Sequence, residues 1–263
     1  MVSLEMLADE LLCHIFSMLC NPVRPKDALR FVYSCRRVYK TTKTDVTRLR
    51  KASYIVRSLQ TTEIGAMDDG VRCDRVTRKK VVAISEQVLR YTTITRLYVG
   101  CMMSHKGPYP MVKGARAIAK NLETNSALTK LNLIGQKCGT LGVVALSEAL
   151  HRNRALKDLN LSYNGAIGIQ AGIALGRMLA VNETLSVLNL RQSQIYAKGA
   201  VAIASALTTN KTLRDLNMDC SDIRLEGTAA VCEAWKMHER WYISLQPEGE
   251  EEEACEAYLK SVL

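Results

Sequence analysis

Histidine and cysteine are the residues of this sequence best suited to act as nucleophiles, bases or metal ligands. The histidines are scattered, at His14, His105, His151 and His238, and the nine cysteines form no C-x-x-C pair and no zinc-like spacing with histidine. The chain also lacks G-x-S-x-G, a P-loop and H-E-x-x-H. We therefore predict a protein that is not an enzyme, with no metal site, no cofactor, no small-molecule substrate, and cysteines that are reduced structural thiols.

Polar residues at regular spacing are better suited to recognition chemistry. They occur as short alternating runs, and in a β-strand alternate residues face the same side. The candidate partner-binding residues are Arg96, Tyr98, Lys130, Asn132, Asp158, Asn160, Asn189, Arg191, Asp215, Asn217 and Asp219. The amides form one column, and the charges run from basic to acidic. Amides at strand spacing hydrogen-bond either an extended partner or one another along a sheet, and the sequence leaves both interpretations open.

The elements that position these residues repeat along the chain. Four segments carry apolar residues in the same pattern: Leu128, Leu131 and Leu133; Leu156, Leu159 and Leu161; Leu185, Leu188 and Leu190; Leu213, Leu216 and Met218. Their first leucines are separated by 28, 29 and 28 residues (156−128, 185−156 and 213−185). A fixed period of this length is typical of a solenoid, in which each unit buries its apolar face against its neighbours.

A helix is predicted to precede each of these strands. An apolar anchor lies six residues before each strand leucine, at Leu122, Leu150, Leu179 and Leu207, and Trp235 continues the series. Three residues after the anchors come Asn125, Asn153, Asn182 and Asn210. We expect these asparagines to end the helices in the left-handed conformation. Six glycines, Gly135, Gly139, Gly142, Gly168, Gly199 and Gly227, are interpreted as turn residues between strand and helix.

This pattern resembles the leucine-rich repeats of the ribonuclease-inhibitor-like class. The resemblance implies an α/β fold, a curved right-handed βα solenoid whose exposed strand face is concave. The asparagine that closes the strand in this class falls at Asn164, whereas the equivalent positions carry Gln136, Ser193 and Ser221. We assign residues 51–247 to the solenoid, with clear repeats at 114–245 and degenerate repeats before them.

The two ends of the solenoid are less regular. Residues 94–99 are predicted to form an earlier strand, and residues 61–80 a loop or a poorly matched first repeat. The last strand is expected at 241–245. Residues 248–263 are interpreted as an acidic C-terminal tail with a short helix from Ala254 to Leu263.

Residues 1–50 are predicted to form a small three-helix module. Its first helix, residues 4–19, has a wide apolar face made of Leu7, Leu11, Leu12, Ile15, Phe16 and Leu19. Three short helices cannot bury a face of this width. Two interpretations remain open: the face docks on a partner, or it caps the open end of the solenoid.

The runs 7–19 and 27–39 resemble an F-box. This resemblance implies docking on the Skp-type adaptor of a cullin–RING (SCF-type) ubiquitin ligase, through the apolar face of residues 4–19. The sequence departs from the motif at Ala8, where proline is usual, at the inserted residues 21–25, and at Val38 or Tyr39, where tryptophan is usual. The two resemblances together predict a substrate-recognition subunit that also binds a protein substrate.

Charge suggests a second function. Residues 1–127 hold 22 Lys and Arg against 11 Asp and Glu, giving +11, whereas residues 128–263 hold 14 against 15, giving −1. A basic half binds nucleic acid or an acidic surface, or is simply solvated. The alternative function is therefore a leucine-rich-repeat scaffold or inhibitor without a ligase role, in a ribonucleoprotein assembly. We expect no membrane partner and a cytoplasmic or nuclear location, because no apolar run is long enough to span a bilayer and acidic residues occupy the N-terminal region.

Overall fold

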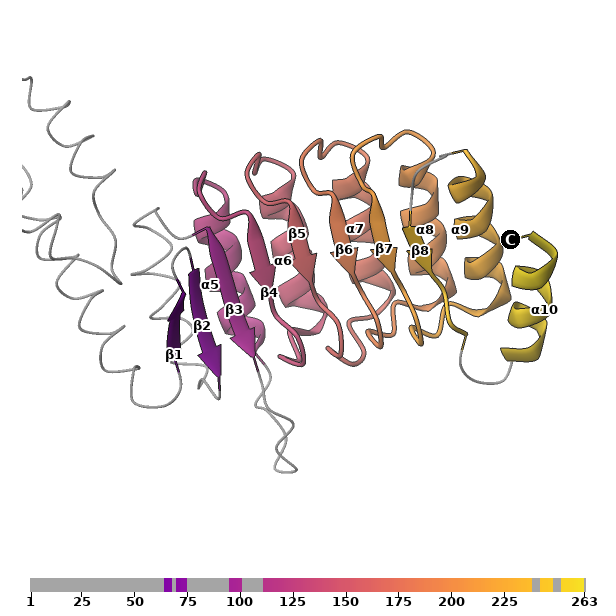
Figure 1. The fold of residues 1–263 in the computed structure, drawn as a ribbon, viewed down its shortest axis with the longest axis horizontal. Coiled ribbons are helices and arrows are strands. Elements are labelled where there is room, and N and C mark those ends of the chain that lie inside the picture. The colour runs from indigo at the N-terminus through magenta and orange to yellow at the C-terminus, as the bar shows by residue number, and fades with distance from the viewer. Residues whose placement is uncertain are drawn as a thin grey trace, which may run out of the picture.

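The computed structural model describes residues 64–67, 70–74, 95–100, 111–237, 242–247 and 252–262. Within them, strands follow one another across a single sheet in chain order, and helices cover one face of it (Figure 1). The strands are β1 (Ile64–Met67), β2 (Gly70–Asp74), β3 (Arg96–Gly100), β4 (Lys130–Asn132), β5 (Asp158–Asn160), β6 (Val187–Asn189), β7 (Asp215–Asn217) and β8 (Tyr242–Ser244). The helices are α5 (Val112–Leu122), α6 (Gly139–Leu150), α7 (Ile169–Leu179), α8 (Tyr196–Leu207), α9 (Arg224–Lys236) and α10 (Glu252–Val262).

The sheet is parallel from β2 to β8 and open at its ends. Its central leucines, Leu97, Leu131, Leu159, Leu188 and Leu216, pair in register from strand to strand. All of them are buried against the helices, as are the four predicted leucine anchors, each of which is the last residue of its helix. The predicted βα solenoid of leucine-rich repeats is therefore confirmed.

The first strands differ from the expectation for residues 61–80. Strands β1 and β2 form an antiparallel hairpin, and β2 then pairs in parallel with β3. Strand β2 thus acts as the strand of an early repeat, whereas the reversed β1 was not expected. The leucine pattern could not predict this edge of the sheet, because neither strand of the hairpin carries the repeated leucines.

The asparagines after the helices do not adopt the predicted left-handed conformation. Asn125, Asn153, Asn182 and Asn210 have no positive φ angle, and all four side chains are buried. The Nδ2 of Asn153 donates to the carbonyl oxygens of Leu122 (2.7 Å) and Asn125 (2.8 Å) of the preceding repeat. Its Oδ1 accepts from the amides of Ala155 (2.9 Å) and Leu156 (2.8 Å).

The same bonds recur at the next two repeats. Asn182 donates to the carbonyl oxygen of Leu150, and Asn210 donates to that of Leu179, both at 2.7 Å. We call the four buried residues Asn125, Asn153, Asn182 and Asn210 the asparagine ladder. It satisfies carbonyl groups at one helix end with side chains of the following repeat, so the prediction was wrong about backbone conformation although it located the turn.

After two of the strands, a serine hydroxyl takes the position at which Asn164 follows β5. Asn164 donates to the carbonyl oxygens of Leu133 (2.9 Å) and Leu161 (2.7 Å). At the equivalent positions, the Oγ of Ser193 donates to Leu161 and that of Ser221 donates to Leu190, both at 2.7 Å. A serine therefore preserves the bond to the previous repeat with a shorter side chain.

Three of the predicted turn glycines lie inside helices instead. Gly135 and Gly168 have positive φ angles at strand-to-helix turns, as does Gly139 at the first position of α6, but Gly142, Gly199 and Gly227 lie within helices. A Cβ atom on Gly172 of α7 would lie 2.5 Å from the Cα atom of Gly199 on α8. These helical glycines allow neighbouring helices to approach closely. The position of a glycine within the repeat does not show this role, because the contact is with another helix.

Helix α10 packs on α9 at the C-terminal end of the sheet (Figure 1). It begins at Glu252, two residues earlier than predicted, and its Cys255 is buried within reach of the Thr228 hydroxyl. Trp235, Ile243 and Leu259 line a small cavity of about 70 Å³ at this junction. The helix therefore covers apolar surface that another repeat would otherwise bury.

Several predictions fall on residues that the structure does not describe. These are the helical module of residues 1–50 with its apolar face, most of residues 51–94, the loop at 101–110, Trp241, and the acidic run at 248–251. The predicted last strand is present at Tyr242–Ser244. In the described ranges, no helix combines the length and apolar character needed to cross a bilayer.

The asparagine ladder makes a testable prediction. Asn153→Ala removes two donated and two accepted hydrogen bonds in a buried site, so we expect the free energy of unfolding to fall by about 3 kcal/mol. Asn132→Ala is the matched control, because its Oδ1 accepts from the Ile134 amide on the partly exposed strand face, and we expect a loss of no more than about 1 kcal/mol. Urea unfolding monitored by circular dichroism measures both. Equal losses would contradict the ladder's role.

Candidate interaction surface

The predicted partner-binding residues lie on the face of the sheet opposite the helices, which we call the strand face. One column contains Arg96, Lys130, Asp158, Val187, Asp215 and Tyr242, and a second contains Tyr98, Asn132, Asn160, Asn189, Asn217 and Ser244. Their side chains alternate with the buried leucines along each short strand. Parallel pairing in register aligns the columns, as the sequence spacing predicted.

The amides of the second column bond mainly to their own strand. The Oδ1 atoms of Asn132, Asn160 and Asn189 each accept from the backbone amide two residues further on, at 2.9 to 3.0 Å. This local bond is the Asx pattern, in which a side chain caps a turn. Of the two interpretations left open by the sequence, bonding of these amides to one another is not seen among the described residues. Within the described residues, their Nδ2 groups donate to no protein acceptor, so this hydrogen-bonding capacity faces outward.

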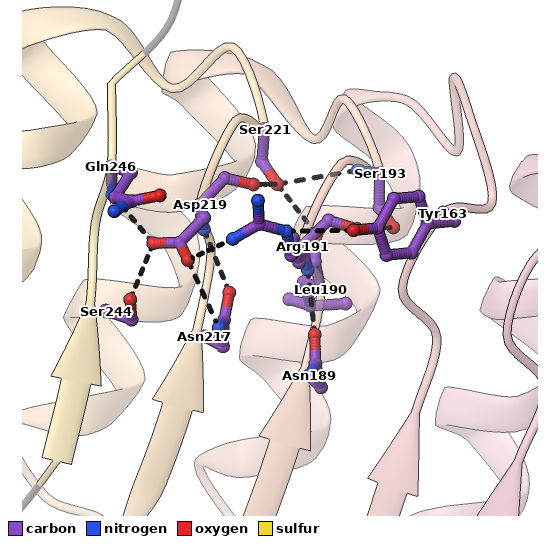
Figure 2. Close-up of polar contacts among 10 residues, drawn as sticks. All are labelled: Tyr163, Asn189, Leu190, Arg191, Ser193, Asn217, Asp219, Ser221, Ser244 and Gln246. Atoms are coloured by element: carbon purple, nitrogen blue, oxygen red, sulfur yellow. Dashed lines mark hydrogen bonds and ion pairs between the residues drawn. The ribbon is translucent and has the colours of Figure 1, made fainter.

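Asp219 and Arg191 lie past the ends of their strands and form a compact polar network (Figure 2). Arg191 donates to Asp219 Oδ2 at 2.7 Å, and its Nε donates to the Tyr163 hydroxyl at 3.2 Å. Asp219 Oδ1 accepts from the Ser244 hydroxyl and from the Gln246 amide, both at 2.7 Å. Asp219 is only 3% exposed. Its carboxylate therefore holds the last strand in place, and only Arg191 and Tyr163 present much surface to a partner.

Lys130 and Asp158 form a second ion pair, on the strand face itself. Their side chains meet at 2.5 Å and remain partly exposed. Donation to Asp158 raises the pKa of Lys130, so this ammonium group is charged at neutral pH. The sequence suggested a face that runs from basic to acidic residues. In the structure, two of its three acidic residues are neutralised by basic neighbours one repeat away.

Asp215 is the acidic residue of this face that remains without a cation. In the described part of the chain its carboxylate forms no ion pair, and Val187 separates it from Asp158 in the column. Partial burial and the negative charge of Asp158 raise its pKa above the ordinary value. An uncompensated, partly buried carboxylate is an attractive position for a partner's positive charge.

Tyr242 was not among the predicted site residues. It is paired with Asp215 across β7 and β8, and its side chain is 65% exposed. The predicted strand 241–245 carries no Leu-x-Leu pattern to fix its register, so the sequence did not place Tyr242 in Asp215's column. Tyr163, Ser244 and Gln246 were also missed, because they contribute through contacts that form only once strands are adjacent.

Four cysteines in the described ranges form no disulfide. Cys138, Cys232 and Cys255 are buried, and Cys220 is partly exposed. Burial raises the pKa of Cys138 to about 12, so its thiol stays protonated at neutral pH. In those ranges, no three side chains of His, Cys, Asp or Glu gather to form a metal site.

The match to a family model agrees with this architecture. A family model described as Leucine Rich repeat matches residues 152–176 and 181–204, which run from before β5 into α8. Among solved structures, "Leiomodin-1 Actin-Binding Site 2 (ABS2)" is similar, with 23% sequence identity and a TM-score of 0.46. The match covers 54% of this chain and 85% of the other.

The fold and the family match define the class. This is a protein with leucine-rich repeats arranged as an open βα solenoid, and such repeats are generally non-catalytic modules for protein interaction. The strand face of this solenoid presents outward amide groups and one carboxylate without an ion pair among the described residues.

The two ion pairs predict different responses to truncation. Asp219→Ala leaves Arg191, the Ser244 hydroxyl and the Gln246 amide without their acceptor, so we expect the free energy of unfolding to fall by about 3 kcal/mol. Asp158→Ala removes a partly exposed pair and is expected to cost no more than about 1 kcal/mol. Chemical denaturation of both variants tests the difference. A similar loss in the two would show that the Asp219 network does not hold β8.

Asp215 predicts a pH-dependent gain in stability. Because its pKa is raised, the native state disfavours the ionised carboxylate. The resulting loss of folding stability is absent below the ordinary pKa of 3.8 and develops as pH rises through the folded-state pKa. We therefore expect Asp215→Asn to raise the melting temperature at pH 7 and to match wild type near pH 3, at about the acid end of the titration. Asp222→Asn, at a more exposed carboxylate, is the control and is expected to change little. A lower melting temperature for Asp215→Asn at pH 7 would contradict this account.

Proposed function

We propose that this protein is a non-enzymatic adaptor that selects a protein partner with its strand face and delivers it to an SCF-type ubiquitin ligase. The observation that carries the first half is the chemistry of the strand face. Every described helix from α5 to α9 covers the opposite face of the sheet (Figure 1). The strand face therefore presents its polar groups to solvent, where an extended or folded protein segment can meet them.

The groups available for a partner are of three kinds. The Nδ2 atoms of Asn132, Asn160 and Asn189 are donors that the described fold does not use. Asp215 supplies negative charge, and Tyr242 supplies exposed aromatic surface. Donors, a charge and an aromatic ring on one rigid sheet give specificity without requiring the fold to rearrange.

The second half of the proposal rests on the sequence of residues 7–39. The apolar face of the predicted first helix, with Leu11 and Ile15 near its centre, matches the F-box pattern and is wider than a three-helix module can bury. We propose that this face docks on a Skp-type adaptor. A protein that joins a ligase to its substrate needs two separate binding surfaces, and the F-box-like segment and the strand face belong to different parts of the sequence.

Recovery of a Skp-type adaptor on the full-length chain tests the ligase role. We expect wild type to retain a purified Skp-type adaptor, and Leu11→Ala with Ile15→Ala to weaken that binding about tenfold or more, because truncation of central apolar anchors carries most of the loss. The matched control is Leu141→Ala with Val181→Ala, which truncates two apolar side chains exposed on the solenoid, and it should bind as wild type does.

Melting temperatures of the same variants separate docking from capping. If the apolar face only caps the solenoid, the Leu11 and Ile15 variant melts lower and adaptor recovery is unchanged. Failure of wild type to bind the adaptor, or unchanged binding by the variant, would rule out the ligase role. The strand face would then belong to a solenoid with some other interaction role.

A further inference from the structure

Three side chains on consecutive strands form a small surface that the fold does not explain. Val187 on β6, Asp215 on β7 and Tyr242 on β8 occupy adjacent positions of one column on the strand face. Neighbouring strands are about 4.8 Å apart, so the three residues span about 10 Å of backbone. We call Val187, Asp215 and Tyr242 the β6–β8 patch.

The chemistry of the patch is complementary to a cation. Its central carboxylate has no basic partner in the described residues, although Arg214 is its neighbour in sequence. On one side lies an exposed phenol ring, and on the other a partly exposed aliphatic side chain. The preceding acidic residue of the column, Asp158, is already paired with Lys130. The patch is therefore the place on this face where a positive charge is missing.

We propose that the β6–β8 patch binds an arginine side chain of the protein partner. The guanidinium group forms paired hydrogen bonds with the Asp215 carboxylate and stacks on the Tyr242 ring, while its aliphatic stem lies against Val187. Guanidinium suits this arrangement better than ammonium, because it is planar, forks to match a carboxylate and stacks on aromatic rings. The raised pKa of Asp215 agrees with this assignment, since a bound cation would relieve it.

The residues around the patch limit how many cationic side chains it can bind. Asp219, further along the same strand and loop, is committed to Arg191, Ser244 and Gln246 and offers no second carboxylate. Asn217 donates to Asp219 at 3.3 Å, so its amide is also engaged. The patch therefore holds one cationic side chain and not a run of them, which distinguishes it from a general acidic surface.

This inference rests on the proposed function, because it assigns the partner chemistry of the same strand face. The direct probe is N-acetyl-arginine amide, titrated into full-length protein and followed by the NMR signals of the Val187 methyl groups. The comparator is N-acetyl-citrulline amide, which has nearly the same shape without the charge. We expect the arginine probe to shift these signals and the citrulline probe to bind about tenfold more weakly, because a charge-assisted pair is lost.

Variants locate the probe on the patch. Asp215→Asn and Tyr242→Leu should each weaken arginine binding, whereas Tyr242→Phe, which keeps the ring, and Asp158→Asn should retain it. Equal binding of arginine and citrulline amides by wild type would overturn the proposal without any variant. Unchanged arginine binding by Asp215→Asn would overturn it as well.

Two further outcomes separate this inference from the adaptor function. If a Skp-type adaptor binds wild type through Leu11 and Ile15 while Asp215→Asn still binds the arginine probe as wild type does, the arginine site is wrong and the ligase role stands. If the arginine site holds but no Skp-type adaptor binds, the ligase role is wrong and the patch stands. A wild-type dimer that Asp215→Asn converts to a monomer in sizing chromatography would identify a second copy as the occupant and overturn the assignment to a separate partner.

Discussion

Buried carbonyl groups at the helix ends are the constraint on which the repeat stack depends. An α-helix leaves its last carbonyls without partners, and these lie in a dry interior where an unsatisfied polar group is costly. The asparagine ladder satisfies them from the following repeat, through the Nδ2 atoms of Asn153, Asn182 and Asn210. Each repeat therefore needs its successor for polar as well as apolar reasons, and helix α10 covers apolar surface beside α9.

This constraint also explains which asparagines are available for binding. Asparagine recurs at two places in every repeat, and the sequence alone shows the same spacing for both. The ladder residues are buried and use both ends of the amide, whereas Asn132, Asn160 and Asn189 use only Oδ1 and keep the donor outward. The difference follows from position. The ladder residues lie in the buried turns between helix and strand, whereas Asn132, Asn160 and Asn189 lie on the strand face.

Leucine spacing was enough to predict the fold, because burial follows the period of the apolar residues and the period is nearly constant. It located the strands, the last residue of four helices and the columns of the strand face. It predicted a left-handed turn at Asn153 instead of the buried ladder role, and it did not predict the helical position of Gly199 or the hairpin partner of β2. Each of these depends on what lies across from the residue, and a contact such as Gly172 against Gly199 exists only after the helices are side by side. Tyr242 was missed for the same reason, since its strand lacks the leucines that align the others.

The strand face carries one acidic residue that the fold does not need. Val187 occupies the equivalent position of the preceding repeat without any charge, so the sheet tolerates an apolar side chain there. Asp158 and Asp219 are each balanced by a basic neighbour, whereas Asp215 is partly buried and repelled by Asp158. A residue that destabilises its own fold, beside an exposed aromatic ring on an otherwise regular surface, is better explained by an interaction than by folding. Asp215 and Tyr242 depart locally from the regularity of the leucine-rich repeats, and for that reason we propose them as binding residues.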